Sequence, residues 1–352
     1  MTDEILFSET NGWGVITLNR PDALNALTRH MVRAFHAKLI EWETHPSIRA
    51  VLVKGAGDRA FCAGGDIRWL HDTAKEDPAL ASEFFRDEYT NNAAIYHFPK
   101  PYVALIDGIV MGGGVGVSVH GDFRVAGDRT LFAMPETGIG LFPDVGGGHF
   151  MPRLHDGLGL YYALTGARAK AADCMAAGIA THYVPSEELE ALEQALLQIN
   201  LTSHAHADIE AALDARAGDP GHAGVNDRRD QIKSFFESPA SLEALMKALA
   251  DDGGQFASET FETLSRMSPT SMALTFEQMS RGGALDFDDC MQMEFRIVRR
   301  VMEGHDFFEG VRAQIIDKDR KPVWKPSRLE DVSPDAIARY FDDLGDAELQ
   351  LA

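Results

Sequence analysis

The chain has 352 residues, of which 45% are hydrophobic and 25% charged, as in soluble globular proteins with one large domain or two. Its net charge of −21 repels phosphate backbones and anionic membranes, which argues against nucleic acid or a membrane as partner. The three cysteines have no paired spacing and fit a reducing compartment, and no metal-ligand spacing is present. The acidic N-terminus lacks a targeting pattern, and no apolar run reaches about 18 residues, so we expect a cytoplasmic protein.

The first hundred residues alternate between short apolar runs and segments of helical spacing. Thr28 is a suitable N-cap for a helix over about 29–43, and a helical stretch is predicted over about 80–97. Strand-like runs enriched in β-branched residues occupy 13–18, 50–54 and 101–106. This alternation predicts an α/β fold, either a parallel sheet with helices or a stacked spiral of ββα units.

Further along, a glycine-rich turn that opens a helix is predicted over 112–120, followed by strands at 123–127 and 130–133. The polar segment 204–232 reads as a connection, which would separate a catalytic region, 1–203, from a helical C-terminal region, 233–352. Two helices are expected in that last region. The first has an apolar face formed by Met291, Phe295, Val298 and Met302. The second begins at Ser333, which is its expected N-cap.

Two glycine segments precede the middle of the chain, FCAGGDI at 61–67 and MGGGVG at 111–116. Glycine lets a backbone N–H approach a ligand closely, so these segments could offer donors to a carbonyl oxygen; the alternative is close packing of backbone on backbone. Cys62 lies between Phe and Ala, a setting more typical of a small buried residue than of a nucleophile. Asp66 is better placed to cap a following helix than to catalyse.

The run FAMPETGIGLFPDVGGG at 132–148 contains two carboxylates, Glu136 and Asp144, in apolar surroundings. Burial raises the pKa of a carboxylate toward the range useful for acid–base or nucleophilic catalysis. The competing interpretation is a helix cap or a turn, since both flanks have turn chemistry. Together with the two glycine segments, the pair favours an enzyme that stabilises an oxyanion or enolate formed from an activated carbonyl.

Four segments together resemble the crotonase superfamily of acyl-CoA enzymes and, within it, the 3-hydroxyisobutyryl-CoA hydrolase branch. They are NRPDALNALT at 19–28, FCAGGDI, KPYVALIDGIVMGGGVG at 100–116 and FAMPETGIGLFPDVGG. The likeness extends into the tail at 306–324. The resemblance implies a crotonase-like spiral of ββα units with a helical C-terminal region. It also implies hydrolysis of a 3-hydroxyacyl-CoA thioester in valine catabolism.

By the same resemblance, the N–H groups of Ala63 and Gly113 would form the oxyanion hole for the thioester oxygen. The backbone from Ala63 through Gly64, Gly65 and Asp66 to Ile67 would line the CoA end of the substrate. Glu136 would be the principal catalytic carboxylate, and Asp144 its partner near the 3-hydroxyl. Glu88 matches a third acid that these hydrolases place near the acyl group; its alternative is a solvated helix residue.

One difference within the superfamily bears on the reaction class. Enoyl-CoA hydratases place a second glutamate where this chain has Gly116, and a glycine cannot activate water for addition. The sequence therefore favours hydrolysis, with no cofactor beyond the CoA of the substrate. A hydratase or isomerase remains the nearest alternative, and a non-catalytic acyl-CoA or RNA-binding protein a more distant one. The resemblance leaves a monomer and a homo-oligomer both open.

Overall fold

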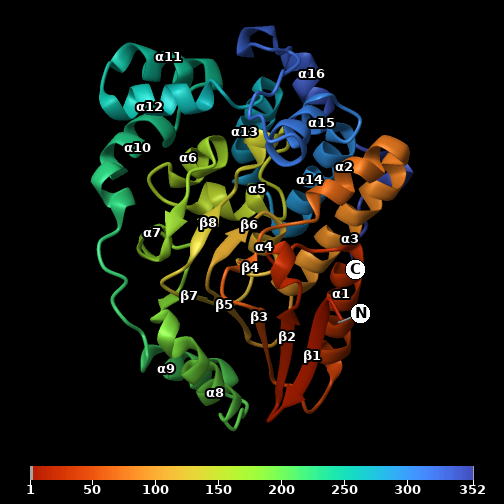
Figure 1. The fold of residues 1–352 in the computed structure, drawn as a ribbon, viewed down its shortest axis with the longest axis vertical. Helices are drawn as coiled ribbons and strands as arrows, with labels where there is room; N and C mark the ends of the chain where they lie inside the picture. The colour runs from red at the N-terminus through yellow and green to blue at the C-terminus, as the bar shows by residue number, and fades with distance from the viewer. Residues whose placement is uncertain (1–2, 352) are drawn as a thin grey trace. The chain divides into compact units, whose positions relative to one another are not determined.

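The computed structural model describes residues 3–351 (Figure 1), which divide into two compact units. Within the described residues, the first unit comprises 3–65, 90–132 and 168–226, and the second comprises 66–89, 133–167 and 227–351. Each unit is therefore assembled from three separate stretches of chain, unlike the contiguous division at 203 and 232 that the sequence suggested. Within residues 3–351, no helix is both long enough and apolar enough to cross a membrane.

A six-stranded sheet forms the centre of the first unit. Its strands pair in the order β1–β2–β3–β5–β7–β10, and all pairs are parallel except β1 with β2. The strands are β1 (Ile5–Thr10), β2 (Trp13–Leu18), β3 (Ala50–Gly55), β5 (Tyr102–Ile106), β7 (Phe123–Ala126) and β10 (His182–Tyr183). The predicted strands at 13–18, 50–54, 101–106 and 123–127 are thus confirmed.

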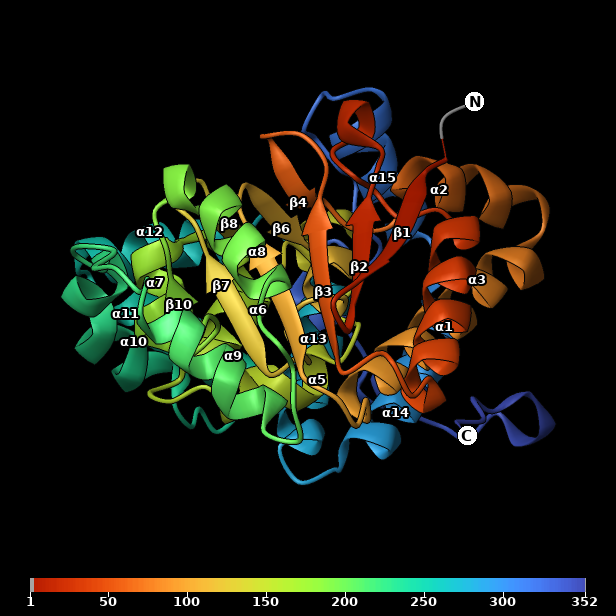
Figure 2. The ribbon, with the colours of Figure 1, turned by 90° about the horizontal axis from the view of Figure 1, so that it is seen from below.

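Helices pack on both faces of this sheet because successive strand residues point to opposite sides. Trp13 and Val15 belong to an apolar cluster with α8 (Leu189–Leu197) and α9 (Ala205–Asp214), which Figure 2 shows beside the sheet. Gly14, between them, faces α1 (Arg29–Thr44). A β-carbon at Gly14 would lie 2.5 Å from the Trp42 ring, so only glycine allows this approach.

The N-terminal cap of α1 is the one predicted, since the Thr28 side chain accepts a hydrogen bond from the Met31 N–H. In contrast, the predicted connection over 204–232 is wrong for much of its length. It contains α9 and the start of α10 (Arg229–Phe236). Ile209 and Leu213 of α9 are fully buried against the sheet, so this polar-looking helix contributes to the core.

A second, four-stranded sheet has the order β4–β6–β8–β9, with β4 (Ala60–Cys62), β6 (Ile109–Met111), β8 (Leu131–Ala133) and β9 (Ala169–Lys170). Strands of the two sheets alternate along the chain with helices, including the short α4 (Gly113–Gly116) and α7 (Ala171–Ala177). The predicted α/β class is confirmed.

The second unit is largely helical. Its helices are α2 (Ile67–Glu76), the part of α3 (Pro78–Tyr96) up to Tyr89, α5 (Gly147–Phe150), α6 (Leu158–Thr165), α10, α11 (Leu242–Asp252), α12 (Gln255–Leu264), α13 (Pro269–Gly282), α14 (Phe287–Val301), α15 (Asp306–Val311) and α16 (Pro334–Arg339). The predicted apolar face of α14 is buried, and Ser333 caps α16 by accepting from the Ala336 N–H.

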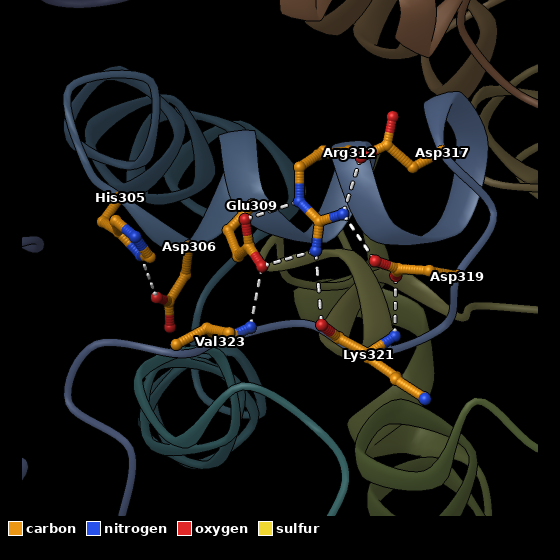
Figure 3. Close-up of polar contacts among 8 residues, drawn as sticks. All are labelled: His305, Asp306, Glu309, Arg312, Asp317, Asp319, Lys321 and Val323. Atoms are coloured by element: carbon orange, nitrogen blue, oxygen red, sulfur yellow. Dashed lines mark hydrogen bonds and ion pairs between the residues drawn. The ribbon is translucent and has the colours of Figure 1, made fainter.

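After α15 the chain turns through a short π-helix (Arg312–Ile316), and one guanidinium holds the loop that follows. Arg312 binds Glu309 through two nitrogens at 2.8 and 2.9 Å and donates to Asp317 and Asp319 at 2.7 Å (Figure 3). It also donates to the backbone carbonyl of Lys321. Arginine suits this position because its planar fork can bind several acceptors at once.

Candidate functional site

The two glycine segments lie against each other within the first unit. A β-carbon at Gly64 (φ +112°) would lie 3.3 Å from the Met111 carbonyl oxygen and 3.6 Å from the Gly113 nitrogen. A β-carbon at Gly114 would lie 2.1 Å from the Cys62 carbonyl oxygen. The packing interpretation of these glycines is therefore correct. It does not exclude a donor role for N–H groups that the packing leaves unused.

The loop between β2 and α1 is hydrogen-bonded to the FCAGGDI segment and to the residues just before it. Asn25 is fully buried, and its amide nitrogen donates to the carbonyl oxygens of Ala56 at 2.9 Å and Ala60 at 2.8 Å. Asn25 and the preceding Leu24 have φ of +57° and +53°, so the loop turns sharply. The Leu27 N–H then donates to the Gly64 carbonyl at 2.8 Å. The segment NRPDALNALT thus has a structural role in holding the FCAGGDI segment.

The position of this loop shows that one predicted oxyanion donor, the N–H of Ala63, is wrong. The N–H of Ala63 donates to the Leu24 carbonyl oxygen at 3.0 Å, so it is not available to a thioester oxygen. Two residues on, the Gly65 N–H has no hydrogen-bond partner among residues 3–351, and neither has the N–H of Gly113, the first residue of α4. Gly65 and Gly113 are therefore among the free donors in these segments.

The remaining residues of the glycine segments have local roles. Asp66 is the N-cap of α2, as predicted, and accepts from the Trp69 N–H at 3.2 Å; Ile67 is the first residue of that helix. Gly116 ends α4 and is buried, with its N–H donating to the Gly112 carbonyl. Cys62 is fully buried and forms no disulfide, which agrees with the interpretation as a small core residue.

The three predicted carboxylates belong to the second unit and come from separate elements. Glu88 lies on α3, Glu136 opens a short 3-10 helix (Glu136–Ile139), and Asp144 lies in the turn before α5. All three side chains are buried, with exposures of only 3–5%. Glu88 is therefore not a solvated helix residue. Among residues 3–351, no three His, Cys, Asp or Glu side chains are arranged so that they could hold a metal ion.

Burial raises the pKa of all three acids, and charge repulsion adds to it for Glu88 and Glu136. Burial raises the pKa of Asp144 to about 7, although the Tyr89 hydroxyl opposes the shift. The pKa of Glu136 lies well above its usual range because of burial and then the charge of Asp144. Burial also raises the pKa of Glu88 well above its usual range, with the charges of Asp144 and Glu136 adding to the effect. Each acid is near enough to act electrostatically on another, as in catalytic carboxylate groups.

Two carboxylate oxygens in this cluster are unused. Oε1 of Glu88 and Oε2 of Glu136 are buried and have no hydrogen-bond partner within residues 3–351. Buried polar atoms are normally satisfied by protein, water or ligand. These two atoms therefore indicate where a substrate or a reacting water would bind in this unit.

Two residues that act on Asp144 were not predicted from the sequence. The Tyr89 hydroxyl donates to Oδ2 of Asp144 at 2.8 Å, fully buried. Glu294, on α14, accepts from the backbone N–H groups of Gly146 and Gly148, two and four residues after Asp144. The sequence contains a pattern that could have identified Glu294, because this acid interrupts the apolar helix face formed by Met291 and Val298.

Known proteins resemble this chain over almost its whole length. A 3-hydroxyisobutyryl-CoA hydrolase of Xenopus laevis is 51% identical over 341 residues, covering 96% of this chain and 88% of that protein. The Homo sapiens protein of the same name is 46% identical over 353 residues, with coverages of 99% and 91%. Among solved structures, a carnitinyl-CoA dehydratase of Mycobacterium thermoresistibile has a TM-score of 0.92 at 38% identity, covering 99% of each chain. An enoyl-CoA hydratase of Rhodobacter sphaeroides has a TM-score of 0.91 at 36% identity, covering 99% and 100%.

These relatives contradict one prediction and establish the family. Both hydrolases carry the word mitochondrial in their names, which contradicts the predicted cytoplasmic location. Reduced cysteines and an acidic surface fit any reducing compartment, so they do not distinguish the cytoplasm from the mitochondrion. The family model described as enoyl-CoA hydratase/isomerase matches residues 13–341. The chain belongs to the enoyl-CoA hydratase/isomerase family.

Proposed function

We propose that this chain hydrolyses the thioester of 3-hydroxyisobutyryl-CoA to the hydroxy acid and CoA, a step of valine catabolism. The observation that carries the proposal is the buried cluster of Glu88, Glu136 and Asp144, with free oxygens on the first two. Relatives at 44–51% identity over nearly the full chain are named for this activity. 3-Hydroxypropionyl-CoA, one carbon shorter, is a second expected substrate.

The oxyanion would be bound by backbone donors of the first unit. The N–H groups of Gly65 and Gly113 would donate to the thioester oxygen, which gains charge as the carbonyl is attacked. One such donor is typically worth on the order of 3 kcal/mol of transition-state stabilisation. The backbone of Gly64 and its neighbours up to Ile67 would line the CoA end of the substrate.

Glu136 would carry out the chemical step. Its carboxylate either attacks the carbonyl carbon, forming a mixed anhydride that water then hydrolyses, or removes a proton from an attacking water. Both routes require the ionised form, and its raised pKa makes that form a stronger base and nucleophile. The CoA thiolate is a good leaving group, so we expect neither a metal nor an organic cofactor to be needed.

The other two acids would recognise the acyl group. As a carboxylate, Asp144 would accept a hydrogen bond from the 3-hydroxyl of the substrate, using the oxygen that Tyr89 leaves free. Glu88 would lie beside the acyl chain and, with its raised pKa, could donate as a neutral acid. The result is a preference for hydroxylated over plain acyl thioesters.

A hydratase is the alternative, because the two solved structures above are of proteins named dehydratase and hydratase. Gly116 weighs against it, since it offers no side chain where hydratases have their second glutamate. Loss of one of two cooperating acids should impair water addition far more than hydrolysis.

Replacement of Glu136 by Gln tests the assignment. The amide keeps the shape of the side chain but is neither base nor nucleophile, so CoA release should be abolished. Binding of the acyl-CoA, measured by calorimetry, should stay within a few-fold. A Glu136→Gln variant with full thioesterase turnover would overturn the proposed role of Glu136.

A further inference from the structure

Glu294 is a fully buried carboxylate near the middle of α14, a helix whose neighbouring positions Met291, Phe295 and Val298 are apolar and buried. A charge in such a place is costly unless hydrogen bonds compensate for the lost water. Nothing in the proposed chemistry uses Glu294. The molecule nevertheless retains an acid where a leucine or methionine would fill the same space.

The compensating bonds come from the segment around Asp144, from one amide and, at 3.8 Å, from the Cys290 thiol. Oε2 of Glu294 accepts from the Gly146 N–H at 2.8 Å, and Oε1 accepts from the Gly148 N–H at 2.7 Å. Gln278 of α13 donates through Nε2 to Oε1 of Glu294 at 3.1 Å and to the Pro143 carbonyl at 2.7 Å. Glu294 and Gln278 thus hold the chain immediately before and after Asp144.

The held segment has an uncommon conformation. Val145 has φ +52°, a region that β-branched residues rarely adopt, and Gly146 follows with φ +87°. Such a residue costs roughly 1–3 kcal/mol and persists only when its surroundings enforce it. The bonds from Glu294 and Gln278 supply this enforcement. Tyr89 fixes the Asp144 side chain, while the clamp formed by Glu294 and Gln278 fixes its backbone.

We propose that Glu294 is a positioning residue for Asp144, acting through the N–H groups of Gly146 and Gly148. The proposal rests on the role of Asp144 in the proposed function. Glu294 does not touch the substrate. It holds the strained turn that aims the Asp144 carboxylate, and Gln278 supports it.

The first test replaces Glu294 by Gln, which keeps the shape but sets an N–H₂ group against a backbone N–H. The value of kcat/KM for 3-hydroxyisobutyryl-CoA should fall by roughly 10- to 100-fold, the loss typical of a misplaced catalytic group. Glu303→Gln, an exposed change just beyond the same helix, is the matched control and should leave kcat/KM unchanged.

A double-mutant cycle separates positioning from a general structural effect. In an Asp144→Asn background, Glu294→Gln should cause less than about threefold further loss, because the group it positions is already gone. Equal losses in both backgrounds would overturn the proposal, and so would a folded Glu294→Gln variant with full activity. Full activity of Asp144→Asn by itself would instead refute the role of Asp144 and thus the basis of the clamp.

Gly148→Ala provides a second perturbation if the glutamine variant does not fold. Its β-carbon would lie 3.0 Å from Oε1 of Glu294, Nε2 of Gln278 and Sγ of Cys290, so it pushes the clamp aside without altering any polar group. The same drop in kcat/KM, again absent in the Asp144→Asn background, is expected. Retention of full activity would contradict the clamp.

Discussion

Replacement of Tyr89 by Phe should move the acid limb of the pH–rate profile to higher pH. The Tyr89 hydroxyl donates to Oδ2 of Asp144 at 2.8 Å, and both side chains are buried. A hydrogen bond to a charged acceptor contributes about 1.5–3 kcal/mol. Since one pKa unit corresponds to about 1.36 kcal/mol, loss of this bond should raise the pKa of Asp144 by roughly one to two units.

The change in rate follows from that shift. Burial raises the pKa of Asp144 to about 7 in the intact protein, so a further rise leaves only a minor fraction ionised at neutral pH. We expect kcat/KM at pH 7 to fall by roughly 5- to 50-fold and to recover substantially near pH 9. Release of CoA thiol from 3-hydroxyisobutyryl-CoA, measured between pH 5 and 9.5, gives the profile.

A matched control is available in the first unit. The Tyr102 hydroxyl is also buried and donates to the Val117 carbonyl at 2.7 Å, away from any carboxylate that it could tune. Tyr102→Phe should lower stability without moving the limb. If the acid limb of the pH–rate profile is unshifted in Tyr89→Phe, or shifts equally in both variants, the Tyr89 hydroxyl does not tune the pKa of Asp144.

Two further predictions concern stability. Because burial raises the pKa of Asp144, the folded state binds the proton of this carboxyl more tightly than the unfolded state does. The contribution of Asp144 to the free energy of unfolding is therefore greatest below pH 4 and is lost as the pH rises through about 7. The full loss is on the order of 4 kcal/mol. Urea unfolding should show a smaller difference in the free energy of unfolding between pH 5 and pH 8 for Asp144→Asn than for the parent. An equal difference in the two proteins would contradict the burial of Asp144 as the cause. Gly114→Ala should destabilise the protein by at least about 3 kcal/mol, since its β-carbon would lie 2.1 Å from the Cys62 carbonyl, a backbone atom that cannot turn away. Thermal unfolding of that variant within a degree of the parent would show that the approach is looser than described.

Local signals in the sequence predicted much of the first unit. Apolar β-branched runs identified β2, β3 and β5, and Thr28 marked the start of α1. The order of strands within the sheets could not be read this way, because parallel pairing joins residues far apart in the chain. The two units escaped prediction for the same reason, since each gathers three separate stretches.

In the candidate site, too, features with a local sequence signal were predicted, and features that depend on distant residues were not. Glu136 and Asp144 stood out because carboxylates are unusual in glycine-rich apolar surroundings. Ala63 was the wrong oxyanion donor because its N–H is taken by Leu24, whose position depends on a loop with positive φ. Glu294 was missed because its partners lie about 150 positions away, although its place on an apolar helix face gave a usable hint.

The central claim is that the acid cluster cleaves a thioester, and the most direct test compares two substrates. Free CoA thiol is followed with a thiol reagent from (S)-3-hydroxyisobutyryl-CoA, beside the 240-nm absorbance of crotonyl-CoA. We expect rapid thiol release from the hydroxyacyl thioester, lost in Glu136→Gln, with no change in the crotonyl absorbance. Loss of the crotonyl absorbance without thiol release would contradict it and identify a hydratase.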